Sequence, residues 1–321
     1  MNSERLLHVD EAVDIRSKTE VVVDSSASPS GRVMREPISF SVDGSRVVGM
    51  LDSPPLGVCR QTTGVVMLNS DDGCRLGPHR LWIRLAERLC REGYPCLRFD
   101  YRGCGDSEGP EGSPPGHIGL MDALAAEHIL RERTGTHHSV LVGICYGAEI
   151  GLLAARCCPT VCGVVACSVG RYVTTAGYKR ALQHGSHYLW AYARKLLQRQ
   201  TWSKLVRGQV NGRFILGGLA DRLNFRHHQK QQDGACMAEV LAGDHHRNVP
   251  ALFIYGSADP LARQEKPGYQ HEAAEQNLNR IFMNVDGADH NFSSLVWSEQ
   301  VICAALAFIH DVACRLSLIH I

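Results

Sequence analysis

The chain has 321 residues, of which 44% are hydrophobic and 21% are charged, which is typical of a globular protein and too apolar for a disordered one. Its 34 Lys and Arg against 33 Asp and Glu give a net charge of +1, which excludes a generally basic nucleic-acid-binding protein and a strongly acidic chain. No apolar run approaches the ~18–20 residues of a membrane span. The charged segment 1–14 lacks the apolar core of a signal peptide.

Cysteine is common in this chain. The 13 cysteines are scattered through apolar segments without a CxxC pair. Such cysteines are typical of a reduced, cytoplasmic protein, in which they act as small core side chains. The histidines show no HxxxH or Cys/His ligand spacing, so we expect neither a metal nor another cofactor.

Strand and helix patterns alternate after a polar lead-in at 1–34, which we expect to be poorly ordered. Segments 37–42 and 46–52 flank Asp43-Gly44 and predict a hairpin. Further strands are expected at 65–68, 95–99, 139–144, 162–168, 251–255 and 280–285. Helices are expected at 81–92, 118–132, 146–156, 267–277 and from 294 onward. The alternation predicts an α/β fold with a mostly parallel eight-stranded sheet, helices on both faces and an antiparallel edge made by the hairpin.

An insertion at 171–248 interrupts this alternation. It contains 13 Lys and Arg and 4 Asp and Glu, a charge of +9, so the rest of the chain carries −8. Its helical pattern predicts a cap over the carboxyl edge of the sheet, with Trp190 and Trp202 contacting substrate, where open α/β folds bind ligands. The alternative is a solvated charged surface.

The remaining domain boundaries follow from these patterns. We expect the core to comprise 35–170 and 249–315. Residues 316–321, with the sequence LSLIHI, match the translation of a common sequencing adapter. We therefore base no fold prediction on these six residues.

The segment 140–148 runs from an apolar strand through Gly-Ile-Cys-Tyr-Gly into a helix. A sharp strand-to-helix turn requires small residues on both sides of the central one, here Gly143 and Gly147 around Cys145. The following helix N-terminus favours negative charge and would help to make Cys145 a nucleophilic thiolate. The alternative is a core cysteine beside a tight turn.

Two residues at strand ends follow Cys145 in the order acid, then base. Asp259 comes just after the strand at 251–255, and His290 comes after the strand at 280–285. His290 would take the thiol proton, and Asp259 would orient the imidazole. Competing candidates are the acids Asp286 and Asp289 and the pairs His227-His228 and His245-His246.

A polar turn, Asn69-Ser-Asp-Asp-Gly73, follows the strand at 65–68. The backbone N–H groups of Asp71 and Tyr146 are the candidate oxyanion donors, and Asn69 is a candidate substrate-binding residue. An ordinary loop is the alternative.

These features together resemble the α/β-hydrolase superfamily over about 37–315. Phe99-Asp-Tyr-Arg-Gly-Cys-Gly-Asp-Ser107 is similar to the D-x-R-G-x-G-x-S turn of that superfamily, and Gly77-Pro-His-Arg80 resembles its serine-aminopeptidase-like branch. Within that branch, the chain resembles exosortase-associated hydrolases, which also carry cysteine in this turn. Two positions depart from the superfamily pattern: Asn69-Ser70 replaces His-Gly, and Cys145 replaces serine, as in dienelactone hydrolases.

The resemblance implies an α/β-hydrolase fold and a hydrolase or acyltransferase that acts on an ester or thioester through Cys145, His290 and Asp259. The expected partner is a small acyl ester or thioester, with an anionic compound as one alternative. No nucleic-acid partner and no membrane span are expected. The alternative function is a non-catalytic hydrolase-fold protein that binds a ligand through its cap.

Overall fold

The computed structural model describes residues 31–71, 73–110, 114, 116–171 and 247–319, with side chains as far as Leu316. Most of the lead-in and nearly all of the insertion lie outside these residues. The structure therefore does not bear on the predicted cap or on Trp190 and Trp202.

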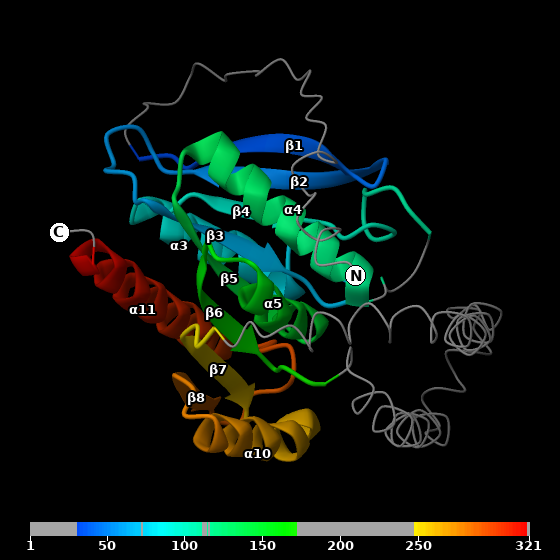
Figure 1. The fold of residues 1–321 in the computed structure, drawn as a ribbon, viewed down its shortest axis with the longest axis vertical. Helices are drawn as coiled ribbons and strands as arrows, with labels where there is room; N and C mark the ends of the chain where they lie inside the picture. Colours follow the sequence, from blue (N-terminus) through cyan, green and yellow to red (C-terminus); the bar gives the residue numbers. More distant parts are fainter. Residues whose placement is uncertain (1–30, 72, 111–113, 115, 172–246, 320–321) are drawn as a thin grey trace. The chain divides into compact units, whose positions relative to one another are not determined.

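An eight-stranded sheet forms the centre of the described core, as predicted (Figure 1). Its spatial order is β1-β2-β4-β3-β5-β6-β7-β8. The strands are β1 (Met34–Val42), β2 (Ser45–Ser53), β3 (Thr63–Leu68), β4 (Cys96–Phe99), β5 (His138–Ile144), β6 (Val161–Cys167), β7 (Ala251–Gly256) and β8 (Arg280–Val285). The β1–β2 and β2–β4 pairs are antiparallel and all other pairs are parallel.

The predicted hairpin is confirmed. Asp43 and Gly44 connect β1 and β2 with φ angles of 48° and 79°. Two successive positive φ angles define the turn whose twist matches that of a two-stranded ribbon. The pairing begins at Met34, opposite Ser53, so β1 is three residues longer than predicted.

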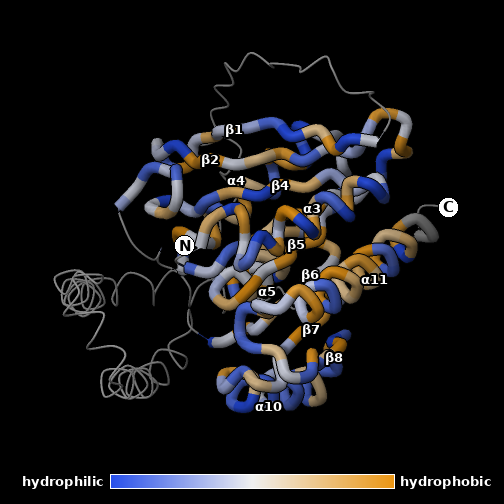
Figure 2. Tube along the Cα trace, turned by 180° about the vertical axis from the view of Figure 1, so that it is seen from behind, coloured by the Kyte–Doolittle hydropathy of each residue, from blue (hydrophilic) through white to orange (hydrophobic). Residues whose placement is uncertain are grey.

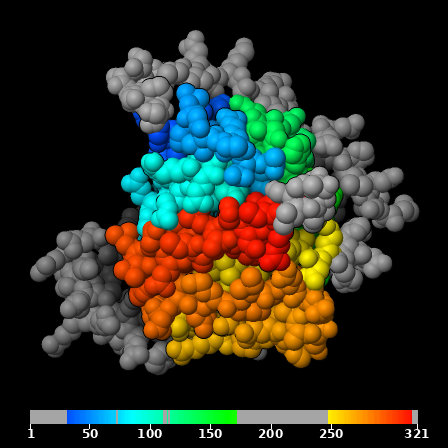
Figure 3. Space-filling model, turned by 90° about the vertical axis from the view of Figure 1, so that its left-hand side faces the viewer, coloured from blue at the N-terminus to red at the C-terminus, as the bar shows by residue number. Residues whose placement is uncertain are grey.

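Helices cover both faces of the sheet. The helices are α3 (Leu81–Arg91), α4 (Gly116–Thr134), α5 (Tyr146–Cys157), α10 (Pro260–Glu275) and α11 (Leu295–Ile319), with a 3-10 turn, η1 (Pro78–Arg80), before α3. One continuous apolar cluster joins α3 and α11 to alternate residues of the central strands, including Val65, Val140 and Val165. Figure 3 shows this face, with α11 in red beside α3 in cyan. Helices α4, α5 and α10 lie on the other face, where Phe253 of β7 packs on Tyr269 of α10 at 5.1 Å.

Hydropathy follows these layers. The central strands and α11 are largely hydrophobic, whereas α10 is largely hydrophilic (Figure 2). All residues of β3, β4 and β7 are buried, as expected for parallel strands covered on both faces.

Helix α11 shows two features that the sequence patterns did not indicate. Leu295–Leu316 has the length and hydropathy, 1.4 over its apolar window, of a helix that could cross a membrane, although 44% of that window is buried. Polar residues interrupt the apolar ones along the chain, but the helix brings Val301, Ile302 and Phe308 together on the face that packs in the core. The helix also continues through residue 319, into the segment that matches an adapter translation.

Helix α10 begins seven residues earlier than predicted. Asp259 is its N-cap, and Pro260 occupies the first turn. A proline is tolerated there because an N–H at this position would have no partner within the helix. The prediction started the helix at Pro267, but this proline lies inside it. An Asp-Pro pair immediately after a strand was therefore the stronger start signal.

Candidate functional site

A strained turn between β5 and α5 carries Cys145. Its φ of 54° and ψ of −118° lie outside the regions that most side chains adopt. A Cβ on Gly143 would lie 2.4 Å from the Gly147 carbonyl oxygen, and a Cβ on Gly147 would lie 2.4 Å from the Asn69 carbonyl oxygen. Only glycine fits at either position, which is the backbone geometry that the sequence predicted for a nucleophile turn. The Cys145 side chain is partly exposed.

Asp259 follows β7 and is 2% exposed. One carboxylate oxygen, Oδ1, accepts a hydrogen bond from the Leu261 N–H at 3.0 Å and caps α10. The other, Oδ2, lies 2.9 Å from Nδ1 of His290. The helix cap thus fixes the carboxylate that orients the imidazole.

The structure separates Asp259 from the competing acids. Asp286 accepts a hydrogen bond from the Ser257 hydroxyl at 3.0 Å. Asp289 accepts hydrogen bonds from the backbone N–H groups of Asn291 and Ser293 at 3.2 and 3.0 Å. Burial alone would raise the pKa of Asp289, but hydrogen bonds from the Ser293 hydroxyl and from these two N–H groups lower it. The competing histidines, 227, 228, 245 and 246, lie outside the described residues.

The loops that carry Asp259 and His290 approach each other closely. A Cβ on Gly256, at the end of β7, would lie 2.3 Å from the Ala288 carbonyl oxygen. Ser168, directly after β6, is fully buried and donates a hydrogen bond from its hydroxyl to the His290 carbonyl oxygen at 2.8 Å. Its φ of 44° is unusual for a residue other than glycine. Ser168 therefore ties the histidine loop to the middle of the sheet.

The imidazole of His290 lies between Asp259 and Cys145. Burial alone would lower its pKa, but hydrogen bonding to the Asp259 carboxylate and to the Cys145 sulfur raises the pKa to about 10. The side chain is 28% exposed, so one part of the ring remains accessible. This environment favours a positively charged imidazole beside the sulfur.

The turn after β3 is here called the β3 turn (69–71 and 73–77). It lies against the Cys145 turn at Gly147. Asp71 is half-buried in it. Tyr146 is the first residue of α5, and its ring packs edge-on against Tyr101 at 5.6 Å. Because this ring is buried, Tyr146 presents its backbone rather than its side chain to the site.

The predicted substrate contact by the Asn69 side chain does not fit the structure. Asn69 is 1% exposed. Its amide nitrogen donates to the Phe99 carbonyl oxygen at 2.7 Å, and its amide oxygen accepts from Trp82 Nε1 at 2.7 Å. Both ends of the amide are used inside the core, so Asn69 holds β3, β4 and α3 together.

Sequence reasoning missed several residues that fix the site: Ser168, Arg75 and Cys104. Ser168 had a positional signal, because it follows a buried strand at the same sheet edge as the other site residues. The contacts of Arg75 and Cys104 span 25 to 33 residues along the chain and required the fold. Among the described residues, no three or more His, Cys, Asp or Glu side chains are grouped to hold a metal ion.

Comparison with known proteins agrees with this geometry. The family model described as "Alpha/beta hydrolase family" matches residues 65–304. The chain belongs to the alpha/beta hydrolase family. The match spans the nucleophile turn, Asp259 and His290 of this family member. A search of the curated proteins found no match.

Solved structures share the same fold. The Pyrococcus furiosus esterase Pf2001 has a TM-score of 0.59 and 18% identity, covering 91% of this chain and 96% of the esterase. A Xanthomonas campestris α/β serine hydrolase described as lacking a lid has a TM-score of 0.53 and 13% identity, covering 88% of this chain and 94% of its own. Mouse alpha/beta hydrolase domain-containing protein 10 has a TM-score of 0.55 and 14% identity, covering 86% of this chain and 99% of its own.

Proposed function

We propose that this alpha/beta hydrolase cleaves or transfers the acyl group of an ester or thioester through Cys145, His290 and Asp259. The observation that carries the proposal is the imidazole of His290, which is bonded to Asp259 at 2.9 Å and hydrogen-bonded to the Cys145 sulfur. The strained backbone at Cys145 supports it, because such strain is typical of functional positions. The esterase and serine hydrolase among the structural neighbours support hydrolysis as the reaction class.

The proposed reaction begins with the Cys145 thiolate beside a protonated His290. The sulfur attacks the carbonyl carbon, and the C=O electron pair moves to oxygen, where the N–H groups of Asp71 and Tyr146 stabilise the negative charge. Collapse of this intermediate expels the alcohol or thiol, which takes the proton from His290, and leaves an acyl group on sulfur.

The second half of the reaction releases the acyl group. Neutral His290 accepts a proton from water or from an acceptor alcohol, whose oxygen attacks the acyl carbon. Expulsion of the Cys145 thiolate then gives the acid or the new ester and restores the protonated imidazole. Asp259 stabilises the imidazolium and holds its Nδ1 in place throughout.

We propose that the substrate carries an anionic group and that the protein acts in the cytoplasm. The support for the first point is the charge of +9 in residues 171–248 against −8 in the rest of the chain. Because salt screens such steering over ~8 Å at physiological ionic strength, kcat/KM for an anionic ester should fall as salt rises. An uncharged ester of equal length should respond little, and equal responses would contradict the anionic substrate.

Chemical labelling and turnover test the proposed nucleophile. Iodoacetamide should alkylate Cys145 faster than the exposed Cys59 and Cys303. Cys145→Ala should abolish turnover of p-nitrophenyl and acyl-CoA esters by the full chain, and Cys303→Ala serves as the matched control. A Cys145→Ala variant that retains turnover would contradict the mechanism, and a wild-type protein without turnover would favour a non-catalytic binding protein.

A further inference from the structure

A second loop lies under the β3 turn and contacts it through a set of buried side chains. This loop, here called the β4 turn (100–108), follows β4, which pairs in parallel with β3. The carboxyl ends of the two strands therefore lie side by side, and the turns that follow them meet at the same sheet edge.

The Cys104 thiol makes one of these contacts. Its sulfur donates a hydrogen bond to the carbonyl oxygen of Asp71 at 3.3 Å. Cys104 is 9% exposed, so its bond to the β3 turn is shielded from water. The thiol thus contacts the residue whose N–H is the proposed oxyanion donor.

Asp100 and Arg75 make the second contact. Asp100 is fully buried, and its Oδ1 accepts from the Arg75 backbone N–H at 2.6 Å. Its Oδ2 forms an ion pair with the Arg75 guanidinium, which also pairs with Asp106 at 2.6 Å. Burial alone would lower the Arg75 pKa, but the bonds to Asp106 and Asp100 raise it. Arg75 is thereby held at both its backbone and its side chain.

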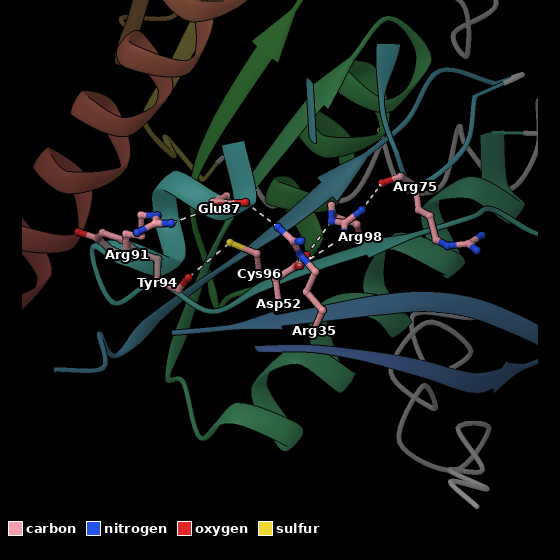
Figure 4. Close-up of polar contacts among 8 residues, drawn as sticks. All are labelled: Arg35, Asp52, Arg75, Glu87, Arg91, Tyr94, Cys96 and Arg98. Atoms are coloured by element: carbon pink, nitrogen blue, oxygen red, sulfur yellow. Dashed lines mark hydrogen bonds and ion pairs between the residues drawn. The ribbon is translucent and has the colours of Figure 1, made fainter. Parts of the chain in front are cut away.

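A third contact reaches the main chain of Arg75 from the opposite side. Arg98 donates a hydrogen bond from Nη1 to the Arg75 carbonyl oxygen at 3.0 Å and another from Nε to the Asp52 carboxylate at 2.7 Å (Figure 4). Arg98 and Asp52 are 3% and 1% exposed. Buried charges are costly unless they are paired, and these are paired with one another and with the main chain of Arg75. Together they fix the main chain of the β3 turn at Arg75.

We propose that Cys104, Asp100 and Arg75 are positioning residues that hold Asp71 with its N–H directed at the carbonyl attacked by Cys145. This inference rests on the proposed function. Preorganised donors are effective because they need no reorganisation as the oxyanion forms. The β4 turn supplies that rigidity to the β3 turn through the Cys104 thiol and the Arg75–Asp100 ion pair.

Comparing two reactions of Cys145 distinguishes a misplaced oxyanion donor from a damaged nucleophile or a misfolded protein. Attack on an ester creates an oxyanion, whereas alkylation by iodoacetamide does not, because it proceeds by displacement at carbon. A loosened β3 turn should therefore slow ester turnover without slowing alkylation. Damage to the nucleophile or general misfolding would slow both.

The experiment compares Cys104→Ala, Cys104→Ser and Arg75→Lys with the matched control Cys90→Ala, which removes a buried thiol from α3. We measure kcat and KM for a p-nitrophenyl ester, the alkylation rate of Cys145, and Tm. Cys104→Ala should lower kcat ~10-fold, a fraction of the effect of removing a whole oxyanion donor. Its KM should change less than twofold, its alkylation rate should be unchanged, and Cys104→Ser should recover most of kcat because the hydroxyl still donates.

Each alternative result overturns the inference. If Cys104→Ala and Arg75→Lys keep the kcat of Cys90→Ala, the β4 turn does not position the donor. If kcat and the alkylation rate fall together, the effect acts on Cys145 and not on the oxyanion. Failure of the proposed function has a different signature, namely ester turnover that survives in Cys145→Ala.

Discussion

The two sides of the candidate site are fixed by different means. The turns that carry Cys145, Asp259 and His290 are held by close backbone packing, in which Gly143, Gly147 and Gly256 leave no space for a Cβ. The β3 turn is held by side chains, through the Arg75–Asp100 ion pair and the Cys104 thiol. Backbone packing fixes positions but tolerates no substitution, whereas a side-chain network can be changed one group at a time.

The largest expected effect is on the backbone-packed side. Asp259→Asn keeps a residue that can cap α10 but removes the negative charge beside His290. We expect kcat to fall ~10³–10⁴-fold and alkylation of Cys145 to slow, in contrast to the β4-turn variants. Asp286→Asn, which alters the carboxylate bonded to Ser257, is the control. An equal loss in both variants would contradict the assignment of the acid.

Gly147→Ala tests the close contact between the Cys145 turn and the β3 turn. The added Cβ would lie 2.4 Å from the Asn69 carbonyl oxygen, and backbone atoms cannot move aside cheaply. We expect a loss of ~1–3 kcal/mol or more in the free energy of unfolding, measured by urea titration. Gly151→Ala in the same helix meets its nearest atom at 3.4 Å and should stay within ~1 kcal/mol of wild type. Similar losses for both would show that close packing at Gly147 is not specific.

The expected effect of Ser168→Ala is smaller. It removes the hydroxyl that donates to the His290 carbonyl oxygen and should cost ~1 kcal/mol of stability with a several-fold loss of kcat. Ser139→Ala is the control, because Ser139 is equally buried and donates a hydrogen bond to Glu127 at 2.8 Å. Ser139 lies at the amino end of β5, whereas the site loops follow the carboxyl ends of the strands. If both variants lose stability but keep kcat, Ser168 contributes to stability and does not position His290.

The last expected effect is a pH dependence of stability. The pKa of His290 in the folded protein is about 10, above its ordinary value of 6.5, so the folded state binds a proton that the unfolded state releases. The stabilisation is fully present below pH 6.5 and is lost as the pH rises toward 10. The Tm advantage of wild type over His290→Gln should therefore shrink between pH 6.5 and 10. An advantage that grows with pH would contradict the raised pKa.

The sequence predicted the backbone-packed side better than the side-chain network. Gly-x-Cys-x-Gly after an apolar strand, and Asp259 and His290 after later strands, carry local signals because each residue follows a strand end at one sheet edge. The partners of Arg75 and Cys104 carry no such local signal. Asn69 shows the same limit, since a polar residue at a strand end looks exposed until Trp82 and Phe99 are placed around it.

Identification of an acylated residue tests the central claim most directly. The full-length protein is mixed with a p-nitrophenyl ester, quenched in acid during turnover, digested and analysed by mass spectrometry. We expect the acyl mass on the peptide that contains Cys145. Turnover with the acyl group on another residue, or turnover by Cys145→Ala, would contradict the claim.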